Sequence, residues 1–441
     1  MDRGWSATSG RAGPDRVLAR TRSEVEARPE VALHHATTAL VRRLDLLAAI
    51  TDQPGETTRT YLSPAMGRAN AQVAEWMREI GLAVREDAVG NVIGRQDGPG
   101  KTLLLGSHLD TVRNAGRFDG PLGVLLPLAA LAVLREEGID LPFAVEVVGF
   151  AEEEGVRFAS AYLGSKGLTG RLRTADLARR DEEGITIAEL LRRRDPQFVL
   201  PAPAHRRRDL LGYVETHIEQ GPVLEARGLP VGVVSAIAGQ TRGKVAFHGK
   251  AGHAGTTPMR LRRDALAGAA EWISWVEQYA GARGRGPLVA TVGTLTVKPG
   301  AANVIPGEAA LSLDIRHPVD RVLKSELAAV LAAGQRIARR RRLKFSWEET
   351  QRDGAVTCDA ALSNLLATSV RAAKITPVRL VSGAGHDGVV MSRLTPIAML
   401  FVRCRGGLSH HPDEYAAPAD LAVALRVICD FLKRLAASSN Q

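Results

Sequence analysis

Two short apolar runs, separated by one helical segment, place the strongest constraint on how this chain folds. The first run, Thr102–Leu105, leads into a glycine-rich turn, and the second run is Phe143–Ala151. The segment between them, Pro121–Glu137, has the pattern of a helix. A strand, a helix and a strand of these lengths form a crossover unit, in which the two strands are parallel neighbours. We therefore predict an α/β fold with a mostly parallel sheet flanked by helices.

Histidine and acidic side chains follow the predicted strands at the point where each strand ends. His108 comes after the first strand of the unit, and Glu152–Glu154 follow the second. The arrangement recurs at two more places, with Tyr213–Thr216 before His217 and Pro396–Val402 before the loop that contains His410. Ligands of open α/β sheets bind outside the carboxyl ends of the strands, so we expect these side chains to meet at one edge of the sheet.

The segment that follows His217 has a different pattern. It contains strand-like runs typical of an antiparallel sheet and two helix-like runs, Arg263–Tyr279 and Val319–Arg340. A chain of 441 residues is long enough for two domains. We predict a loosely ordered tail over residues 1–35, a main domain over 36–226 and 349–441, and an α+β domain inserted between its two parts over 227–348.

The residues expected at the sheet edge form a set suited to two divalent cations. Such a site needs nitrogen and oxygen ligands, a carboxylate able to bridge the two ions and a further carboxylate that stays free as a base. The candidate ligands are His108, Asp119, Glu154, His217 and His410. We expect Asp110 to accept the second imidazole proton of His108 and so to orient the ring. Because the set holds no thiolate, zinc is the expected ion, with manganese as the alternative.

Charge and cysteine content exclude several other classes of function. The net charge of +10 comes from arginine clusters that are scattered along the chain, and aromatic residues make up only 4% of it. A nucleic-acid surface is therefore not expected, whereas an acidic small substrate would benefit from the positive field. The first 35 residues contain no sustained apolar run that would begin a membrane span or a secretory leader. The three cysteines form no C-x-x-C pair, so we expect a cytoplasmic protein.

Eight motifs resemble one known family in their order along the chain, and the likeness extends from about residue 45 to residue 430. They are GSHLDTVRNAGRFDG, FAEEEGVRF, HIEQGPVLE, GKAGHAGTTPM, NVIPG, DIRH, SGAGHDG and RGGLSHHPDEY. Together they resemble the ureido-amidohydrolase branch of the zinc-dependent aminoacylase and carboxypeptidase superfamily. That branch contains N-carbamoyl-L-amino acid hydrolases, β-ureidopropionases and allantoate amidohydrolases.

The resemblance implies a role for each matching residue. The family's metal ligands fall on the five candidates named above, with Asp119 as the bridge, while Glu153 corresponds to the general base and Glu154 to a ligand. The inserted domain resembles the family's lid and dimerisation domain, and His253 matches a histidine that reaches the active site of a neighbouring subunit to stabilise the oxyanion. Substrate contacts are implied for Gln220, Asn303 and Arg316, of which Arg316 is suited to bind a carboxylate in bidentate fashion.

The resemblance further implies a homodimer that hydrolyses a carboxylate-bearing ureido compound. Residues 58–95 and 399–415 are most similar to bacterial allantoate amidohydrolases, which predicts allantoate as the substrate. An N-carbamoyl-L-amino acid hydrolase or a β-ureidopropionase is the alternative. A dinuclear aminopeptidase or dipeptidase and a non-catalytic basic binding protein remain as two further hypotheses. The adjacent histidines His410 and His411 leave two candidates for one ligand, of which His410, directly after Ser409, is preferred.

Overall fold

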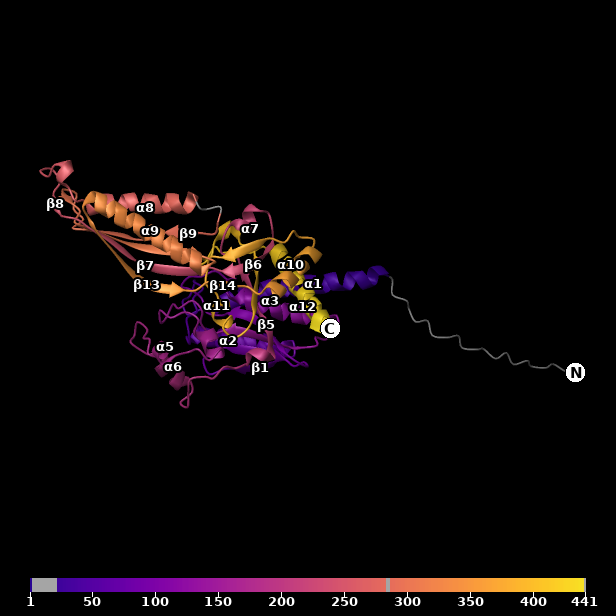
Figure 1. Ribbon diagram of the computed structural model, residues 1–441. Coiled ribbons are helices and arrows are strands. Elements are labelled where there is room, and N and C mark those ends of the chain that lie inside the picture. Colours follow the sequence, from indigo (N-terminus) through magenta and orange to yellow (C-terminus); the bar gives the residue numbers. More distant parts are fainter. Residues whose placement is uncertain (2–21, 283–285, 440–441) are drawn as a thin grey trace.

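The predicted strand, helix and strand form the centre of the larger of two domains. They are β3 (Thr102–His108), α3 (Pro121–Glu136) and β4 (Ala144–Phe150). β3 and β4 pair in parallel along their full length, with His108 opposite Phe150 at the carboxyl end. The computed structural model describes Met1, residues 22–282 and residues 286–439, and Figure 1 shows an elongated second domain that projects from this larger one.

The large sheet has nine strands in the order β1-β2-β4-β3-β5-β16-β6-β14, with β15 also paired to β6. Its four central strands, β4, β3, β5 and β16, are parallel, and β2 and β6 join them on either side in antiparallel orientation. The predicted fold class is confirmed. The remaining strands are β1 (Ala83–Glu86), β2 (Val92–Gln96), β5 (Leu210–Ile218), β6 (Val231–Ile237), β14 (Val356–Thr357), β15 (Arg379–Ser382) and β16 (Ile397–Val402).

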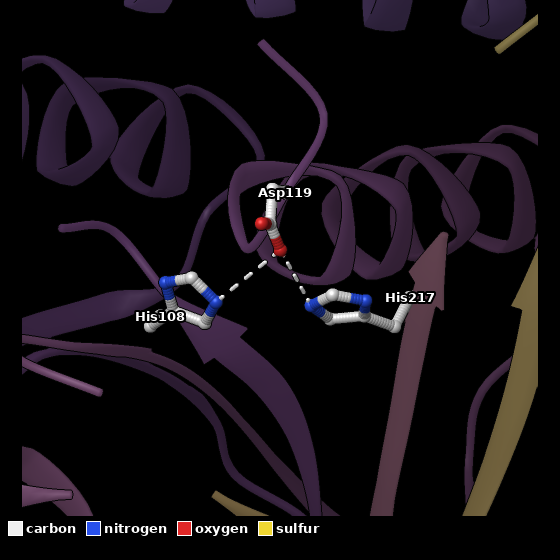
Figure 2. Close-up of side chains that lie close together, drawn as sticks. All are labelled: His108, Asp119 and His217. Atoms are coloured by element: carbon white, nitrogen blue, oxygen red, sulfur yellow. Dashed lines mark ion pairs between the residues drawn. The ribbon is translucent and has the colours of Figure 1, made fainter. Parts of the chain in front are cut away.

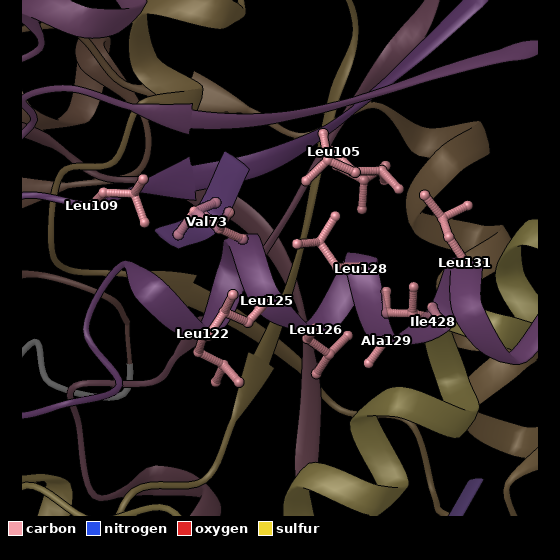
Figure 3. Close-up of a cluster of buried hydrophobic side chains, with 14 of the residues drawn as sticks. Val73, Leu105, Leu109, Leu122, Leu125, Leu126, Leu128, Ala129, Leu131 and Ile428 are labelled. Carbon is pink, nitrogen blue, oxygen red and sulfur yellow. The ribbon is translucent and has the colours of Figure 1, made fainter. Parts of the chain in front are cut away.

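Helix α3 is buried on nearly every side because it lies between the sheet and two further helices. Leu103 and Leu105 of β3 point into the core on the α3 face, while Leu104 belongs to the core on the opposite face, as the alternation of a strand requires. The outer side of α3 contacts α1 (Arg22–Ala48) and α12 (Pro418–Ser439). Figure 3 shows the leucines of α3 packed between β3 and α12. Each fully buried leucine contributes about 1.5–3 kcal/mol, so this packing holds the start of α3 firmly beside the end of β3.

The other helices complete the two layers around the sheet. They are α2 (Pro64–Glu79), α4 (Leu163–Leu168), α5 (Thr174–Leu177), α6 (Ile187–Arg194), α7 (Val223–Ala226), α10 (Ala360–Ala372) and α11 (Gly388–Met391). Across residues 22–282 and 286–439, none of the helices combines the length and apolarity that crossing a bilayer would take.

The N-terminal tail predicted over residues 1–35 is wrong for its last part, because α1 begins at Arg22. Ala32 is only 3% exposed and belongs to the main core together with Leu40, Leu44 and Leu47 of the same helix. This apolar spacing of three to four residues is the stripe of an amphipathic helix, which the arginine-rich start of the chain obscures. Residues 2–21 lie outside the described part of the chain.

The inserted domain consists of an antiparallel sheet with two long helices. Its five-stranded sheet has the order β10-β12-β7-β13, with β9 also paired to β12. Trp272 of α8 donates from its indole nitrogen to the carbonyl of Val330 in α9, at 3.0 Å, in the middle of the domain core. The elements are β7 (Gly239–His248), β8 (Gly252–His253), α8 (Ala265–Ala282), β9 (Val289–Thr291), β10 (Leu295–Lys298), β11 (Val304–Ile305), β12 (Glu308–His317), α9 (Asp320–Arg341) and β13 (Lys344–Asp353).

Sheet membership places the ends of the insertion some residues away from the proposed 227 and 348. β6 follows residue 227 but pairs with β16 and β15 in the large sheet. β13 pairs with β7 as far as Asp353, which lies beyond residue 348. A division at residues 239 and 353 therefore agrees better with the pairing, because a strand belongs to the domain whose sheet it completes.

Candidate metal centre and active site

The five candidate metal ligands meet at the carboxyl edge of the large sheet. His108 and His217 lie at the ends of β3 and β5, and Asp119 stands two residues before α3. Glu154 follows β4, and His410 lies in the loop between β16 and α12. Figure 2 shows Asp119 projecting between the imidazole rings of His108 and His217.

The two carboxylate oxygens of Asp119 face different partners. Oδ1 lies 3.1 Å from His217 Nε2 and 3.8 Å from His108 Nε2. Oδ2 lies 3.0 Å from His410 Nε2, which in turn is 3.3 Å from Glu154 Oε1. Two clusters of potential ligand atoms therefore share this one aspartate, His108–Asp119–His217 and Asp119–Glu154–His410.

The spacing and the state of these atoms fit divalent cations. Two ligands at about 2.1 Å from a tetrahedral zinc ion are about 3.4 Å apart, and the four separations of 3.0–3.8 Å lie around that value. Asp119 Oδ1 and His217 Nε2 are buried and face each other at 3.1 Å, yet neither has a hydrogen-bond partner because the contact lacks hydrogen-bond geometry. Buried polar atoms of native proteins are seldom left in this state, and a cation bound between the two would satisfy both.

Contacts at Nδ1 orient the imidazole rings of His108 and His217, so that the Nε2 atom of each ring faces Asp119. His217 Nδ1 lies 2.9 Å from the carbonyl oxygen of Ile218. His108 Nδ1 lies 3.0 Å from the carbonyl oxygen of Asp110 and 3.4 Å from its carboxylate. Gly120 allows the close approach of the loop, since a Cβ there would come within 2.5 Å of the His108 imidazole.

Asp110 lies beside His108, as expected, but its carboxylate is not the nearest acceptor. The backbone carbonyl is the nearer acceptor for His108, while the carboxylate accepts hydrogen bonds from the backbone N–H groups of Glu153 and Glu154, at 3.0 and 3.2 Å. The side chain therefore ties the loop after β3 to the loop after β4. This role depends on a contact between residues more than 40 positions apart, which spacing along the chain does not reveal.

Burial and charge make the site's carboxylates unequal. Burial, together with the negative charge of Glu154, raises the pKa of Glu153 well above its usual range. Burial acts in the same direction on Asp119, but the adjacent imidazoles of His217 and His410 outweigh it and hold its pKa well below the usual range. Asp119 therefore favours its anionic form, whereas Glu153 has a raised proton affinity.

Glu414, which the motif analysis did not single out, contacts the backbone that carries Asp119. Its Oε1 accepts hydrogen bonds from the backbone N–H groups of Phe118 and Asp119, at 2.8 and 3.1 Å. Its Oε2 lies 2.9 Å from the hydroxyl of Ser409, which is also 3.1 Å from Asp119 Oδ2. The sequence signal is its place in RGGLSHHPDEY, four residues after His410.

Replacing Glu414 by alanine is expected to weaken metal binding about 10- to 100-fold, the usual effect of removing a partner that orients a ligand. Competition with a chromogenic chelator measures the affinity. Asp413→Ala is the matched control, because its side chain is 78% exposed and its nearest ion pair is a 3.7 Å contact with His411. Equal affinities in the two variants would contradict a supporting role for Glu414.

Other residues near the centre were also missed. His386 packs edge-on against His217, with ring centroids 4.5 Å apart, and its Nε2 lies 2.8 Å from the hydroxyl of Ser382. Glu215 is buried below the rings and accepts a 2.7 Å hydrogen bond from Ser107. His386 belongs to SGAGHDG, whereas nothing near Glu215 distinguishes it from an ordinary strand residue.

His410 and not His411 joins the cluster. His410 contacts Asp119 and Glu154, whereas the ion-pair contact of His411 is with Asp413, at 3.7 Å. Both His410 and Gln220 have left-handed backbones, with φ of 56° and 55°. The amide nitrogen of Gln220 lies 3.0 Å from Asp119 Oδ2, so this expected substrate contact reaches the centre itself.

Arg316 lies at the junction of the two domains with part of its guanidinium already engaged. Nε and Nη2 bind the two carboxylate oxygens of Asp314, each at 2.8 Å, and Nη1 donates to the carbonyl of Gly383 in the large domain. The Nε–Nη2 edge of the guanidinium, which is suited to bidentate binding of a carboxylate, is therefore occupied by Asp314. The end of the guanidinium, where one N–H of each Nη remains, is the part left for a ligand.

His253 and Asn303 lie together at the far tip of the inserted domain. β8 pairs with β11, and Ala254 N–H donates to the Asn303 carbonyl at 2.9 Å. Figure 1 places β8 at the end of the molecule opposite the large sheet. Nδ1 of His253 accepts hydrogen bonds from the backbone N–H groups of Gly255 and Thr256, at 3.0 and 3.3 Å, which leaves Nε2 as the protonated, outward-facing nitrogen. Neither residue meets the ligand cluster of its own chain.

Comparison with known proteins agrees with this geometry. Residues 104–434 match the family described as "Peptidase family M20/M25/M40". The chain belongs to the M20 family. The predicted resemblance is confirmed. The matched residues include the five candidate ligands, the insertion and the large sheet from β3 onward.

Two relatives and one crystal structure illustrate the degree of similarity. The chain is 41% identical over 403 residues to an N-carbamoyl-L-amino acid amidohydrolase of Geobacillus stearothermophilus, covering 90% of this chain and 98% of that one. It is 40% identical over 431 residues to an allantoate deiminase of Arabidopsis thaliana, covering 89% and 81%. The crystal structure of an amidase of the hydantoinase/carbamoylase family from Burkholderia multivorans matches with a TM-score of 0.84 and 34% identity, covering 90% and 97%.

Proposed function

We propose that this protein is a dinuclear metal-dependent amidohydrolase that cleaves the ureido group of allantoate. The observation that carries the proposal is the position of Asp119, whose two carboxylate oxygens face two separate groups of ligand atoms with the free carboxylate of Glu153 beside them. His108 and His217 would hold one cation and Glu154 and His410 the other. Zinc is the proposed ion and manganese the alternative, because the ligand atoms are imidazole nitrogens and carboxylate oxygens.

The chemistry is divided among few residues. When bound, the cations supply Lewis-acid polarisation and lower the pKa of water. Glu153 accepts a proton from the attacking water and returns it to the leaving nitrogen, after which the carbamoyl group is released as carbon dioxide and ammonia. His253 donates from Nε2 to the developing oxyanion, and Arg316 binds the substrate carboxylate with the end of its guanidinium.

A homodimer is proposed because one chain cannot complete this set by itself. His253 and Asn303 lie at the tip of the insertion, far from the cluster that they are expected to serve. The insertion also exposes apolar residues on two of its strands, with Val289 of β9 54% exposed and Leu295 of β10 44% exposed. Exposed apolar side chains on the outer strands of a sheet are typical of a protein–protein interface.

The cysteines bear on the cellular location, and the net charge bears on the substrate. All three cysteines are buried thiols without disulfide partners, which supports the cytoplasm as the proposed location. The formal charge of +10 favours the approach of an anionic substrate.

The second candidate function is hydrolysis of N-carbamoyl-L-amino acids, which is favoured by the 41% identity to the Geobacillus stearothermophilus relative. We expect zinc- or manganese-loaded protein to release ammonia from allantoate faster than from N-carbamoyl amino acids, measured side by side in a coupled ammonia assay. The reverse order of rates would assign the chain to the second candidate. Hydrolysis of dipeptides without ammonia release from either ureido substrate would instead indicate a peptidase.

A further inference from the structure

Tyr162 occupies an unusual place between the general base and the substrate-binding arginine. It is a non-glycine residue with a left-handed backbone, at φ 67°, directly before α4. Its backbone N–H donates to the carbonyl of Glu153 at 3.1 Å, so the two residues are held side by side. A bulky residue seldom adopts this conformation, and residues that do are typical of sites where the direction of the side chain matters.

The hydroxyl of Tyr162 rests against the loop that also binds Arg316. A Cβ added at Gly385 would overlap the hydroxyl oxygen, so the phenol lies directly on the backbone of that glycine. Two residues earlier in the same loop, the carbonyl of Gly383 accepts a hydrogen bond from Arg316 Nη1. Tyr162 and Arg316 therefore border one short stretch of chain that leads directly to His386, the neighbour of His217.

The hydroxyl makes no hydrogen bond of its own within residues 22–282 and 286–439. Burial raises the pKa of the phenol well above its usual value, and the negative charge of Glu153 adds to the effect. The group therefore keeps its proton and can only donate to an anion. Because no hydrogen bond to the described part of the protein occupies it, the hydroxyl is available to donate to a ligand.

We propose that Tyr162 is a substrate-contacting residue whose hydroxyl donates a hydrogen bond to the carboxylate held at the free end of Arg316. This inference rests on the proposed function, because it takes its ligand to be a carboxylate-bearing ureido compound. Asp314 occupies the side edge of Arg316, so the guanidinium offers a substrate carboxylate only the N–H groups at its free end. The carboxylate can accept a further hydrogen bond, and Tyr162 supplies the donor. Tyr162 thereby contributes to the preference for anionic over neutral substrates.

The test removes only the hydroxyl, with Tyr162→Phe, and measures steady-state kinetics and binding. For the ureido substrate that the wild type hydrolyses, KM is expected to rise about tenfold or more with kcat within about twofold, as loss of a hydrogen bond to a charged group predicts. The same compound with a carboxamide in place of the carboxylate should show a KM change below about twofold, because the charged acceptor is missing. An unchanged KM, an equal change for both compounds, or a fall in kcat alone would overturn the proposal.

Binding to inactive protein separates this proposal from the proposed function. Calorimetry compares Glu153→Gln with the double variant Glu153→Gln/Tyr162→Phe, using an N-carbamoyl-L-amino acid as the probe, and the double variant is expected to bind about tenfold more weakly. If wild type hydrolyses the ureido substrate and the two affinities are equal, the function stands and the role of Tyr162 fails. If wild type shows no hydrolysis but the affinities differ, the role of Tyr162 stands and the function fails. Absence of binding to Glu153→Gln would overturn both.

Two further variants control for structural effects. Tyr279→Phe makes the same chemical change in α8 of the inserted domain, where the hydroxyl lies 2.6 Å from Glu326, and should leave KM unchanged. Gly385→Ala should raise KM like Tyr162→Phe, because the new methyl group displaces the hydroxyl. In the Tyr162→Phe background the same alanine should have a smaller effect on KM, since residues in contact are not additive. If the effects of the two substitutions on KM were fully additive, displacement of the Tyr162 hydroxyl would not be the cause of the Gly385→Ala effect.

Discussion

Glu153→Gln is expected to lose turnover by about 10²–10⁴-fold while it keeps both metal ions, because the amide cannot accept the proton of the attacking water. Glutamine has the size and shape of glutamate, so packing around residue 153 should change little. Stopped ammonia assays over long incubations measure the residual rate, and elemental analysis measures two ions per chain before and after the substitution.

The metal content decides between two roles for this residue. Glu153 also lies near enough to His108 and Glu154 to form a possible ligand group with them. A variant that loses an ion would therefore identify Glu153 as a ligand, and one that keeps both ions and substantial activity would place the base elsewhere. Glu182→Gln is the control, since that side chain is 84% exposed and its ion-pair contact is with Arg113.

His253→Ala is expected to lower kcat by about 10²–10³-fold through loss of a donor to the oxyanion. Its distance from the ligand cluster of its own chain makes a stronger prediction about pairs of variants. Mixing Glu153→Gln protein with His253→Ala protein should restore activity, because a hybrid dimer contains one site with an intact base and an intact partner histidine. Random exchange of subunits gives about half hybrids with one working site of two, and so about a quarter of wild-type activity.

The complementation separates two arrangements of the site. If His253 acted within its own chain, each hybrid would carry two damaged sites and mixing would restore nothing. Combining both substitutions in one chain and mixing it with His253→Ala provides the matched control, since no dimer in that mixture contains a complete site. Size-exclusion chromatography with light scattering verifies that the variants are dimers and exchange subunits.

Much of the fold followed from local pattern. The apolar runs of β3 and β4 and the helix between them were predictable because buried strands and a buried helix of these lengths leave one handed arrangement. The start of α1 was not predictable, because its apolar positions are spread among charged residues and its helical state depends on packing against α3 and α12. The ends of the insertion were equally hidden, since the place of β6 depends on which strand it pairs with.

The candidate site, like the fold, was only partly predictable from the sequence. That His108, Asp119, Glu154, His217 and His410 would converge was predictable from the ends of parallel strands, each of which delivers its loop to the same edge. Glu414 and Tyr162 were not predictable, since their importance lies in a hydrogen bond to Asp119 and a contact with Gly385 across more than 200 residues of chain.

The sequence by itself determined the family, the parallel pairing of β3 with β4 and the set of side chains that meet at the sheet edge, because these depend on residue type and local periodicity. Only the tertiary structure decided how the side chains are used. Asp110 orients His108 with its carbonyl, Arg316 keeps one end free because Asp314 holds its side, and His253 lies beyond the reach of its own centre. The reason is physical: hydrogen-bond direction and reach are set by contacts between distant segments, and those contacts exist only after the chain has folded.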